Sequence, residues 1–145
     1  MHHVMPSRGA KSIVRAGLCL PVVICGLALR LLGPGLGLPA FVVKYGGSLL
    51  WAAMVFFLVA IAASRSTRRS VVMVAAVIAV GVELFRLVHT PWLDSFRLTM
   101  AGALLLGRIF SPWDILAYAI GIALGALLDN LVLAMVRSAR PHSAS

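Results

Sequence analysis

Residues 113–136 read WDILAYAIGIALGALLDNLVLAMV, and this run decides what kind of protein the chain forms. A membrane-spanning helix requires about 20 consecutive residues that are mostly apolar. The run meets that length, and its charged residues are confined to Asp114 at the start and Asp129 nearer the far end. It therefore predicts a helix that crosses a lipid bilayer.

The composition of the whole chain agrees with a membrane protein. Of the 145 residues, 61% are hydrophobic and 12% are charged, whereas soluble domains typically contain about 45–50% apolar residues. The formal net charge is +9, but the basic residues lie mostly at the ends of apolar runs, where cations meet anionic headgroups. We therefore expect membrane lipids as partners and no nucleic acid.

Three earlier apolar runs also have the length of membrane helices. They cover about residues 13–32, 45–63 and 71–88. The sequence therefore predicts an all-α integral membrane bundle of four transmembrane helices, in a single domain over residues 13–136.

The longest connection, residues 89–112, is not simply polar. It contains MAGALLLG at 100–107, which is too short to span a bilayer, so we expect a short re-entrant or interfacial helix before the last span. The last span then begins with Ser111 as N-cap and Pro112 at the first helical position, and Asp114 is expected to complete a capping box.

The distribution of lysine and arginine predicts the orientation. With four spans, eight of these residues lie on the side of the termini and five on the other side. The positive-inside rule then places residues 1–12 and 137–145 in the cytoplasm as tails. Residues 83–114 face the outside in this arrangement. Three tryptophans are expected near that side as interfacial anchors: Trp51, Trp92 and Trp113.

The stretch ELFRLVHTPWLDSFR, residues 83–97, gathers polar groups in an otherwise apolar chain. Glu83 and Asp94 are two of only four acidic residues, and Arg86 and Arg97 each follow one of them by three positions. Glu83 lies about 18 Å into its span, where a charge costs on the order of 2.5–3.5 kcal/mol. We therefore expect Glu83 to point into the protein and to have a partner.

The last span has a face that matches Glu83. Asp114 and Tyr118 lie on it above Gly121 and Gly125, whose spacing permits close helix packing. The face of Glu83 carries two small residues for the same purpose, Ala76 and Ala79. The predicted outer polar cluster comprises Glu83, Arg86, Asp94, Arg97, Asp114 and Tyr118, with Lys44 as another cation within reach.

Two interpretations of this cluster stay open. It either holds the helices together as a structural contact or forms a pocket in which the arginines bind an anionic headgroup.

The remaining polar residues and motifs carry less information. Asp129, near the opposite end, is expected to meet Arg137 or the headgroups. Cys19 and Cys25 are interpreted as buried packing residues. The chain contains no phosphate-loop, zinc-protease or nucleophile-elbow motif, so no catalytic residue, metal or cofactor is assigned.

Two segments, residues 44–60 and 82–129, resemble a small bacterial integral-membrane family known only as a domain of unknown function. A more distant likeness is to VanZ-like proteins, which place an acidic residue late in a helix, then an arginine, then an aspartate and glycines in the last helix. Glu83, Arg97 and Asp114 occupy comparable places here. Arg86 stands where those proteins usually have Gln, and Tyr118 where they commonly have Asn.

These resemblances imply a multi-pass protein of the bacterial inner membrane with a role at the envelope. The leading hypothesis is a non-enzymatic protein that binds an anionic lipid or lipid-linked headgroup at the outward-facing cluster. Three alternatives are a small oligomeric transporter or proton-coupled carrier, a membrane enzyme acting on a lipid-linked substrate, and a structural subunit of a membrane complex. A homo-oligomer therefore stays open as a partner.

Overall fold

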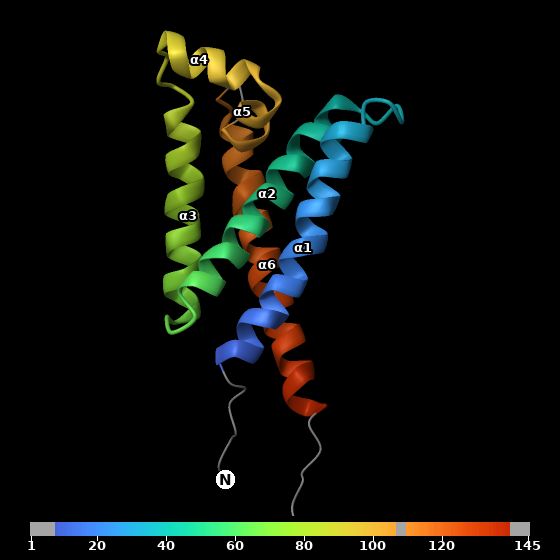
Figure 1. The fold of residues 1–145 in the computed structure, drawn as a ribbon, viewed down its shortest axis with the longest axis vertical. Coiled ribbons are helices and arrows are strands. Elements are labelled where there is room, and N and C mark those ends of the chain that lie inside the picture. The colour runs from blue at the N-terminus through green and yellow to red at the C-terminus, as the bar shows by residue number, and fades with distance from the viewer. Residues whose placement is uncertain (1–7, 107–109, 140–145) are drawn as a thin grey trace, which may run out of the picture.

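A computed structural model describes residues 8–106 and 110–139 of the chain, except for the side chain of Arg8. The chain is all-α within these residues (Figure 1). The six helices are α1 (Arg8–Leu32), α2 (Ala40–Ala62), α3 (Arg68–Phe85), α4 (Pro91–Leu98), α5 (Met100–Leu105) and α6 (Pro112–Ser138).

Three of the helices are long and apolar enough to cross a membrane. The candidate spans are Gly9–Leu32, Ala40–Ala62 and Pro112–Ser138. The helix α3 is not among them, because its 18 residues include Arg68, Arg69 and Glu83. The chain is therefore a multi-pass membrane protein with three candidate transmembrane helices, and the four spans expected from the sequence are not shown.

Helix α2 is the central element of the bundle. It crosses obliquely between its neighbours and contacts α1, α3 and α6 (Figure 1). Helices α1, α3 and α6 run roughly along the long axis. The described ends nearest the two termini lie at one end of the molecule, and α4 and α5 lie at the opposite end, above α3 and the start of α6.

The core lies where α2 meets α3 and α6. Phe56 and Phe57 of α2 are fully buried and pack edge to face, with ring centroids 5.5 Å apart. Ala79 of α3 is buried against this core, and Ala76 is partly buried beside it. Small residues on α3 therefore let its backbone come close to α2, as their spacing predicts.

Glycines bring α6 into contact with α2. A Cβ atom on Gly121 would overlap the backbone carbonyl oxygen of Leu49, and one on Gly125 would lie 3.0 Å from Cδ1 of Phe56. Only glycine leaves room for this approach, because the Leu49 carbonyl belongs to the α2 backbone and cannot swing aside.

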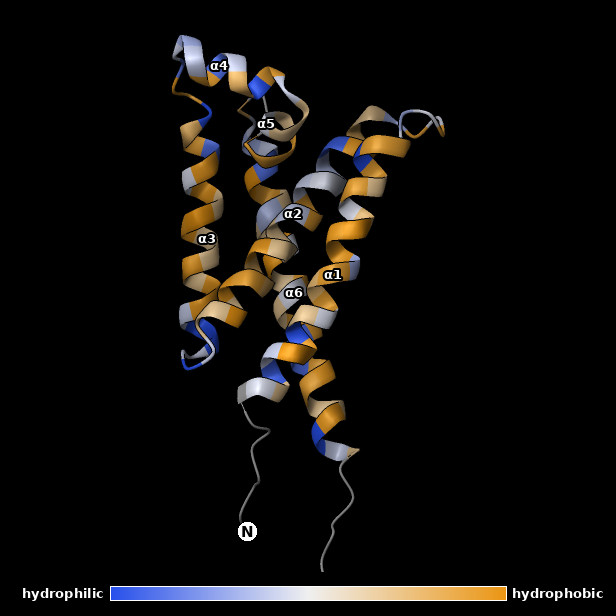
Figure 2. Ribbon diagram, viewed as in Figure 1, coloured by the Kyte–Doolittle hydropathy of each residue, from blue (hydrophilic) through white to orange (hydrophobic). Residues whose placement is uncertain are grey.

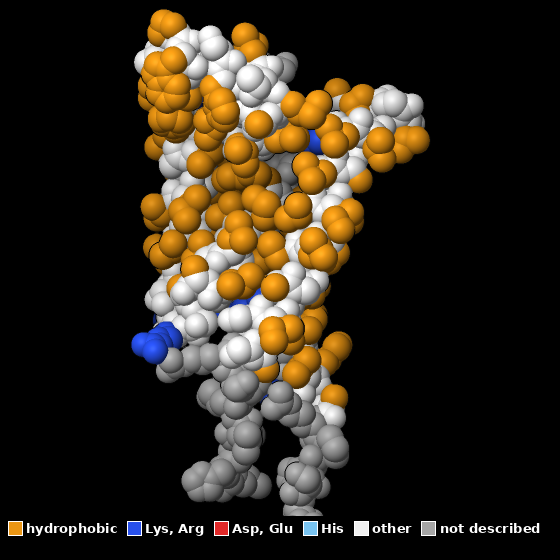
Figure 3. Space-filling view, in the orientation of Figure 1, with side chains coloured by type: hydrophobic (Ala, Val, Ile, Leu, Met, Phe, Trp, Pro, Cys, Tyr) orange, Lys and Arg blue, Asp and Glu red, His pale blue; other side chains and the backbone are white. Residues whose placement is uncertain are grey.

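The outer surface of the bundle is apolar around its middle. Hydrophobic residues cover the lengths of all four long helices (Figure 2). The face in Figure 3 is mostly hydrophobic over its middle height, with basic side chains near the lower end and a small basic patch high on the face. Such a belt suits contact with lipid chains rather than water.

At the end of the molecule near the termini, an ion pair joins α1 to α6. Arg15 donates from Nε to Oδ1 of Asp129 (2.8 Å) and from Nη2 to Oδ2 (3.0 Å), and from Nη1 to the carbonyl oxygen of Ala60 (2.7 Å). Asp129 is 2% exposed. The expectation that Asp129 meets Arg137 or the headgroups is therefore wrong, because Arg15 reaches it first across the helix interface.

Removing this carboxylate charge should weaken the α1–α6 contact. Asp129→Asn leaves Arg15 with one side-chain oxygen from residue 129 where it now has two, while the Ala60 carbonyl stays as an acceptor. Hydrogen bonds to charged groups contribute about 1.5–3 kcal/mol. We expect the free energy of unfolding in mixed micelles to fall by roughly that amount. Asn130→Ala is the neighbouring control, since it removes only an exposed hydrogen bond to Arg68. An equal loss in both variants would contradict the prediction.

The connection before α6 contains two short helices instead of one. Within MAGALLLG, α5 covers Met100–Leu105, and α4 precedes it with a single residue between them. The turn is tight, since a Cβ on Gly102 would overlap the carbonyl oxygen of Phe96. Residue 107 lies outside the described residues.

Candidate functional site

The polar site is built around Arg86, at the end of α3. Its Nη1 lies 2.6 Å from Oε2 of Glu83 and 2.9 Å from Oδ2 of Asp114. All three side chains are buried, with Glu83 fully inaccessible. The two carboxylates come from α3 and α6, so the arginine between them ties these helices together. We call Glu83, Arg86 and Asp114 the buried triad.

Glu83 also holds the start of α6. Its Oε1 accepts a hydrogen bond from the backbone N–H of Ser111 (2.7 Å), and its Oε2 accepts one from the hydroxyl of Tyr118 (2.9 Å). Carboxylates are stabilised at helix N-termini, where backbone N–H groups lack partners. Ser111 is the N-cap as predicted, but the capping box is wrong, because Glu83 rather than Asp114 accepts from the Ser111 N–H.

Asp114, which does not cap its own helix, faces α2 as well as Arg86. Its Oδ1 accepts a hydrogen bond from Oγ of Ser48 (3.1 Å), and the same hydroxyl lies 3.1 Å from the carbonyl oxygen of Lys44. On the other side, Nε of Arg86 donates to the carbonyl oxygen of Leu106 (2.6 Å). The buried triad therefore connects α2, α3 and α6 with the residue that follows α5.

Asp94 and Arg97 form a separate group on α4. Arg97 donates to the carbonyl oxygens of Phe85 (2.6 Å) and Val88 (2.8 Å), and it pairs with Asp94 at 3.2 Å. Carbonyl groups at the end of a helix lack partners within it, and Arg97 donates to that of Phe85, the last residue of α3, and to that of Val88 just beyond it. The structure thus divides the predicted single cluster in two, and Arg97 fastens α4 to α3.

A cavity of about 590 Å³ opens beside the buried triad. We call it the head cavity. It is lined by Arg30, Pro34, Leu38, Ala40, Val43, Lys44, Ser48, Arg86, Ala103 and Asp114. Among the residues that the structure describes, its charged lining comprises three cations and one carboxylate.

Two of these cations have donors to spare. Within residues 8–106 and 110–139, the hydrogen-bond acceptor of Arg30 is the carbonyl oxygen of Ala103, 3.0 Å from Nη1. In the same part of the chain, the Lys44 ammonium has no acceptor and lies 5.1 Å from the ring centroid of Tyr45. Arg86, by contrast, is engaged by both carboxylates. The free donors of the site therefore belong to Arg30 and Lys44.

Sequence reasoning missed Arg30 and Ser48 as parts of this site. In the sequence, the position of Arg30 near the end of a span favours the interpretation that its long side chain extends to the lipid headgroups. A Cβ on Gly47 would lie 2.9 Å from its Nε, so the glycine lets the guanidinium lie against α2. The adjacent pair Gly47-Ser48 inside an apolar helix was the one signal of this contact.

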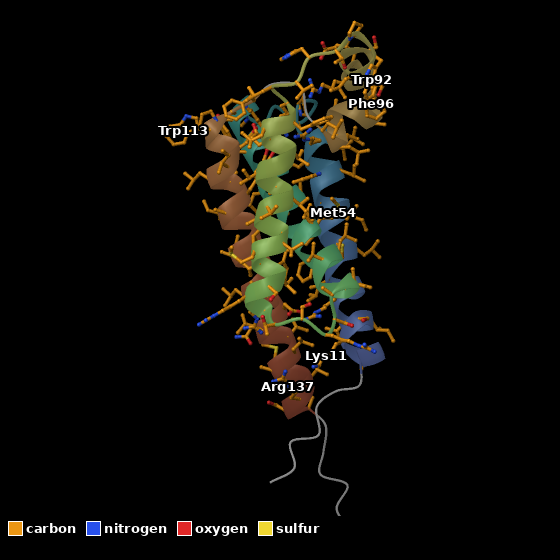
Figure 4. The ribbon with its side chains drawn as sticks, turned by 90° about the vertical axis from the view of Figure 1, so that its left-hand side faces the viewer. Lys11, Met54, Trp92, Phe96, Trp113 and Arg137 are labelled. Atoms are coloured by element: carbon orange, nitrogen blue, oxygen red, sulfur yellow. The ribbon has the colours of Figure 1, made fainter. Side chains whose placement is uncertain are left out.

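The tryptophans lie in two different places. Trp92 and Trp113 are exposed, at the same end of the molecule as α4 (Figure 4). Trp51 lies in the middle of α2, with its ring centroid 5.5 Å from that of Tyr118. The expectation that Trp51 is an interfacial anchor is wrong, because it lies at mid-helix, partly buried against the core.

The residues that the structure describes include no group of three His, Cys, Asp or Glu side chains placed to hold a metal ion. Cys19 is buried, whereas Cys25 is exposed, unlike its expected packing role. Chemically, the cavity places the cations Arg30, Lys44 and Arg86 next to the Asp114 carboxylate, and cations of this kind can donate charge-assisted hydrogen bonds to anionic oxygens.

No solved structure matches this chain. The likeness to VanZ-like proteins and a bacterial source stay predictions. A protein-family model with the description "Protein of unknown function (DUF2809)" matches residues 37–122. This range is more than half of the chain, and it contains α2, α3, the buried triad and Tyr118. The chain therefore belongs to the DUF2809 family, whose function is unknown.

Proposed function

We propose that this protein binds an anionic lipid or lipid-linked headgroup in the head cavity, as a non-enzymatic protein of the bacterial inner membrane. The observation that carries the proposal is the pair of cations with free donors, Arg30 and Lys44, on the wall of one cavity. Donors that lack protein acceptors suit phosphate or carboxylate oxygens, which form short charge-assisted hydrogen bonds with them.

The formal charges around the cavity support an anionic ligand. Arg30, Lys44 and Arg86 contribute three positive charges, and Asp114 contributes a negative one. Glu83, behind Arg86, adds a second negative charge. The charges of the described residues thus leave one positive charge, which a ligand with one negative charge would neutralise.

The buried triad has a supporting role in this proposal. Arg86 already has two carboxylate partners and a carbonyl acceptor, and both oxygens of Glu83 accept hydrogen bonds. We therefore propose that Glu83, Arg86 and Asp114 hold the helices together, and that Arg30 and Lys44 contact the ligand. The two interpretations of the cluster thus apply to different residues.

We further propose that α3 is a fourth crossing and that both termini face the cytoplasm. At about 1.5 Å per residue, the 18 residues of α3 extend about 27 Å, close to the roughly 30 Å of a hydrocarbon core. Basic residues gather at the end where the termini lie, on α1, the α2–α3 connection, the start of α3 and α6. They include Lys11, Arg65, Arg68, Arg69 and Arg137. The positive-inside rule then places the head cavity on the outer side.

Lys44→Gln tests the proposed binding. The Lys44 side chain is exposed, and among the described residues its polar interaction is with the Tyr45 ring, so the fold should be retained. We expect about tenfold weaker retention of phosphatidylglycerol, since a charge-assisted hydrogen bond contributes about 1.5–3 kcal/mol. The measurement is native mass spectrometry of protein from nanodiscs that contain phosphatidylglycerol and phosphatidylcholine in equal amounts.

Lys11→Gln is the matched control, because it removes the same charge at the opposite end of the molecule (Figure 4). Phosphatidylglycerol retention that is equal in the wild type and Lys44→Gln would refute the proposal.

Three other results would favour the alternative functions. Flux of a solute or of protons in proteoliposomes would favour the carrier, and turnover of a lipid-linked substrate would favour the enzyme. A stoichiometric partner after mild solubilisation would favour the structural subunit.

A further inference from the structure

A second cavity, of about 260 Å³, lies next to the head cavity and is apolar. We call it the tail cavity. Its lining comes from α1, α2 and α5: Val22, Val23, Gly26, Leu27, Arg30, Gly47, Leu50, Trp51, Met54, Ala101, Leu104 and Leu105. Arg30 lines both cavities, so its side chain borders each of them.

The tail cavity extends from the level of Arg30 toward the middle of the bundle. From Arg30 to Val23, α1 advances by seven residues, or about 10 Å. Met54, on the α2 side, lies near mid-height (Figure 4). A molecule that fills both cavities therefore has its charged part at the outer end and its apolar part pointing into the membrane.

Two glycines keep this space open. Neither Gly26 nor Gly47 has a side chain to occupy it, and a Cβ on Gly26 would only touch Cβ of Leu50, at 3.5 Å. Among the described residues of the lining, Arg30 is the one that carries a charge. A cavity lined by apolar side chains excludes water and accepts hydrocarbon. A lipid chain is the occupant that matches both this lining and the adjacent cations.

We propose that the ligand is an anionic amphiphile whose charged group binds Arg30 and Lys44 while one hydrocarbon chain occupies the tail cavity. This rests on the proposed function and adds the substrate class, namely an anionic lipid recognised by its chain as well as its headgroup. Each methylene that enters the cavity should raise the affinity up to about fourfold. Affinity should stop rising when the chain has filled the cavity.

Binding of n-alkyl phosphates of increasing chain length tests this inference. The purified protein in one fixed detergent is titrated with each alkyl phosphate, and the dissociation constant is plotted against chain length. For the wild type we expect a steep decrease in Kd followed by a plateau. Gly26→Leu fills the tail cavity and should move the plateau to shorter chains. Met54→Ala enlarges the cavity and should move it to longer chains.

Two further variants separate the tail from the head. Cys25→Leu places the same leucine side chain at the neighbouring position, which is exposed and outside the lining, so its curve should match the wild type. Lys44→Gln should raise Kd by a similar factor, about tenfold, at every chain length.

Opposite plateau shifts in Gly26→Leu and Met54→Ala would support the tail site. If both variants kept the wild-type plateau while Lys44→Gln still weakened binding, the tail site would be overturned and the headgroup site would stand. If Lys44→Gln had no effect at any length, the proposed function itself would fail. Because the two cavity variants act in opposite directions, a general loss of folding cannot imitate the expected result.

Discussion

Glu83→Gln is expected to lower the free energy of unfolding by about 3–5 kcal/mol, the cost of breaking a buried ion pair from one side. The carboxylate receives hydrogen bonds from Ser111 and Tyr118 and an ion pair from Arg86. The glutamine carboxamide has one oxygen acceptor, and its NH2 group is a hydrogen-bond donor. If the oxygen faces Arg86, the NH2 group faces the Ser111 N–H, and if the oxygen faces Ser111, the NH2 group faces the Arg86 guanidinium. In either orientation two donors face each other.

Asp94→Asn is the matched control for this prediction. Asp94 also precedes its arginine by three residues, but its side chain is 44% exposed and the pair is longer, at 3.2 Å. Exposed ion pairs contribute about 0–1 kcal/mol. Unfolding of both variants in mixed micelles, followed by circular dichroism, measures the difference. Similar losses in the two would show that burial of Glu83 does not determine its contribution.

Gly121→Ala is expected to destabilise the protein by about 1–3 kcal/mol, the usual cost of overpacking a filled interface. The added methyl group would overlap the carbonyl oxygen of Leu49, which is a backbone atom of α2. Helices α2 and α6 would have to separate, and this separation would disturb the contact between Ser48 and Asp114. The same unfolding measurement applies, together with the retention of phosphatidylglycerol.

Gly81→Ala provides the comparison, because a Cβ on Gly81 of α3 meets nothing within 4 Å. Alanine favours helix by about 1 kcal/mol over glycine, so this variant should be as stable as the wild type or more so. If Gly121→Ala were also as stable as the wild type, the close approach of α2 and α6 at this position would be refuted.

The long helices could be predicted from the sequence because a bilayer imposes a length and an apolar composition on each span. The four expected runs coincide with α1, α2, α3 and α6 to within a few residues at most ends. The inward position of Glu83 was also predictable, since a charge within an apolar run is costly unless it faces protein. Gly121 and Gly125 were predictable as packing positions from their spacing.

The pairing of charges was much less predictable. Several arginines lay within reach of each carboxylate, and sequence spacing favoured Arg137 for Asp129 over Arg15, which is 114 residues away. The capping box at the start of α6 had an intrahelical candidate in Asp114, but Glu83 of α3 performs the role. In both places a side chain from another helix replaced the local partner.

The sequence by itself determined that this is an all-α membrane protein, where its long helices lie and which end carries the polar groups. The hydrophobic effect and the cost of burying charge act on each segment separately, so composition is sufficient to establish these features. The tertiary structure decided which carboxylate meets which arginine, and it brought Arg30, Lys44 and Ser48 to one cavity. Those contacts depend on how α1 and α2 are rotated and crossed, and that geometry arises only when all the interfaces pack together.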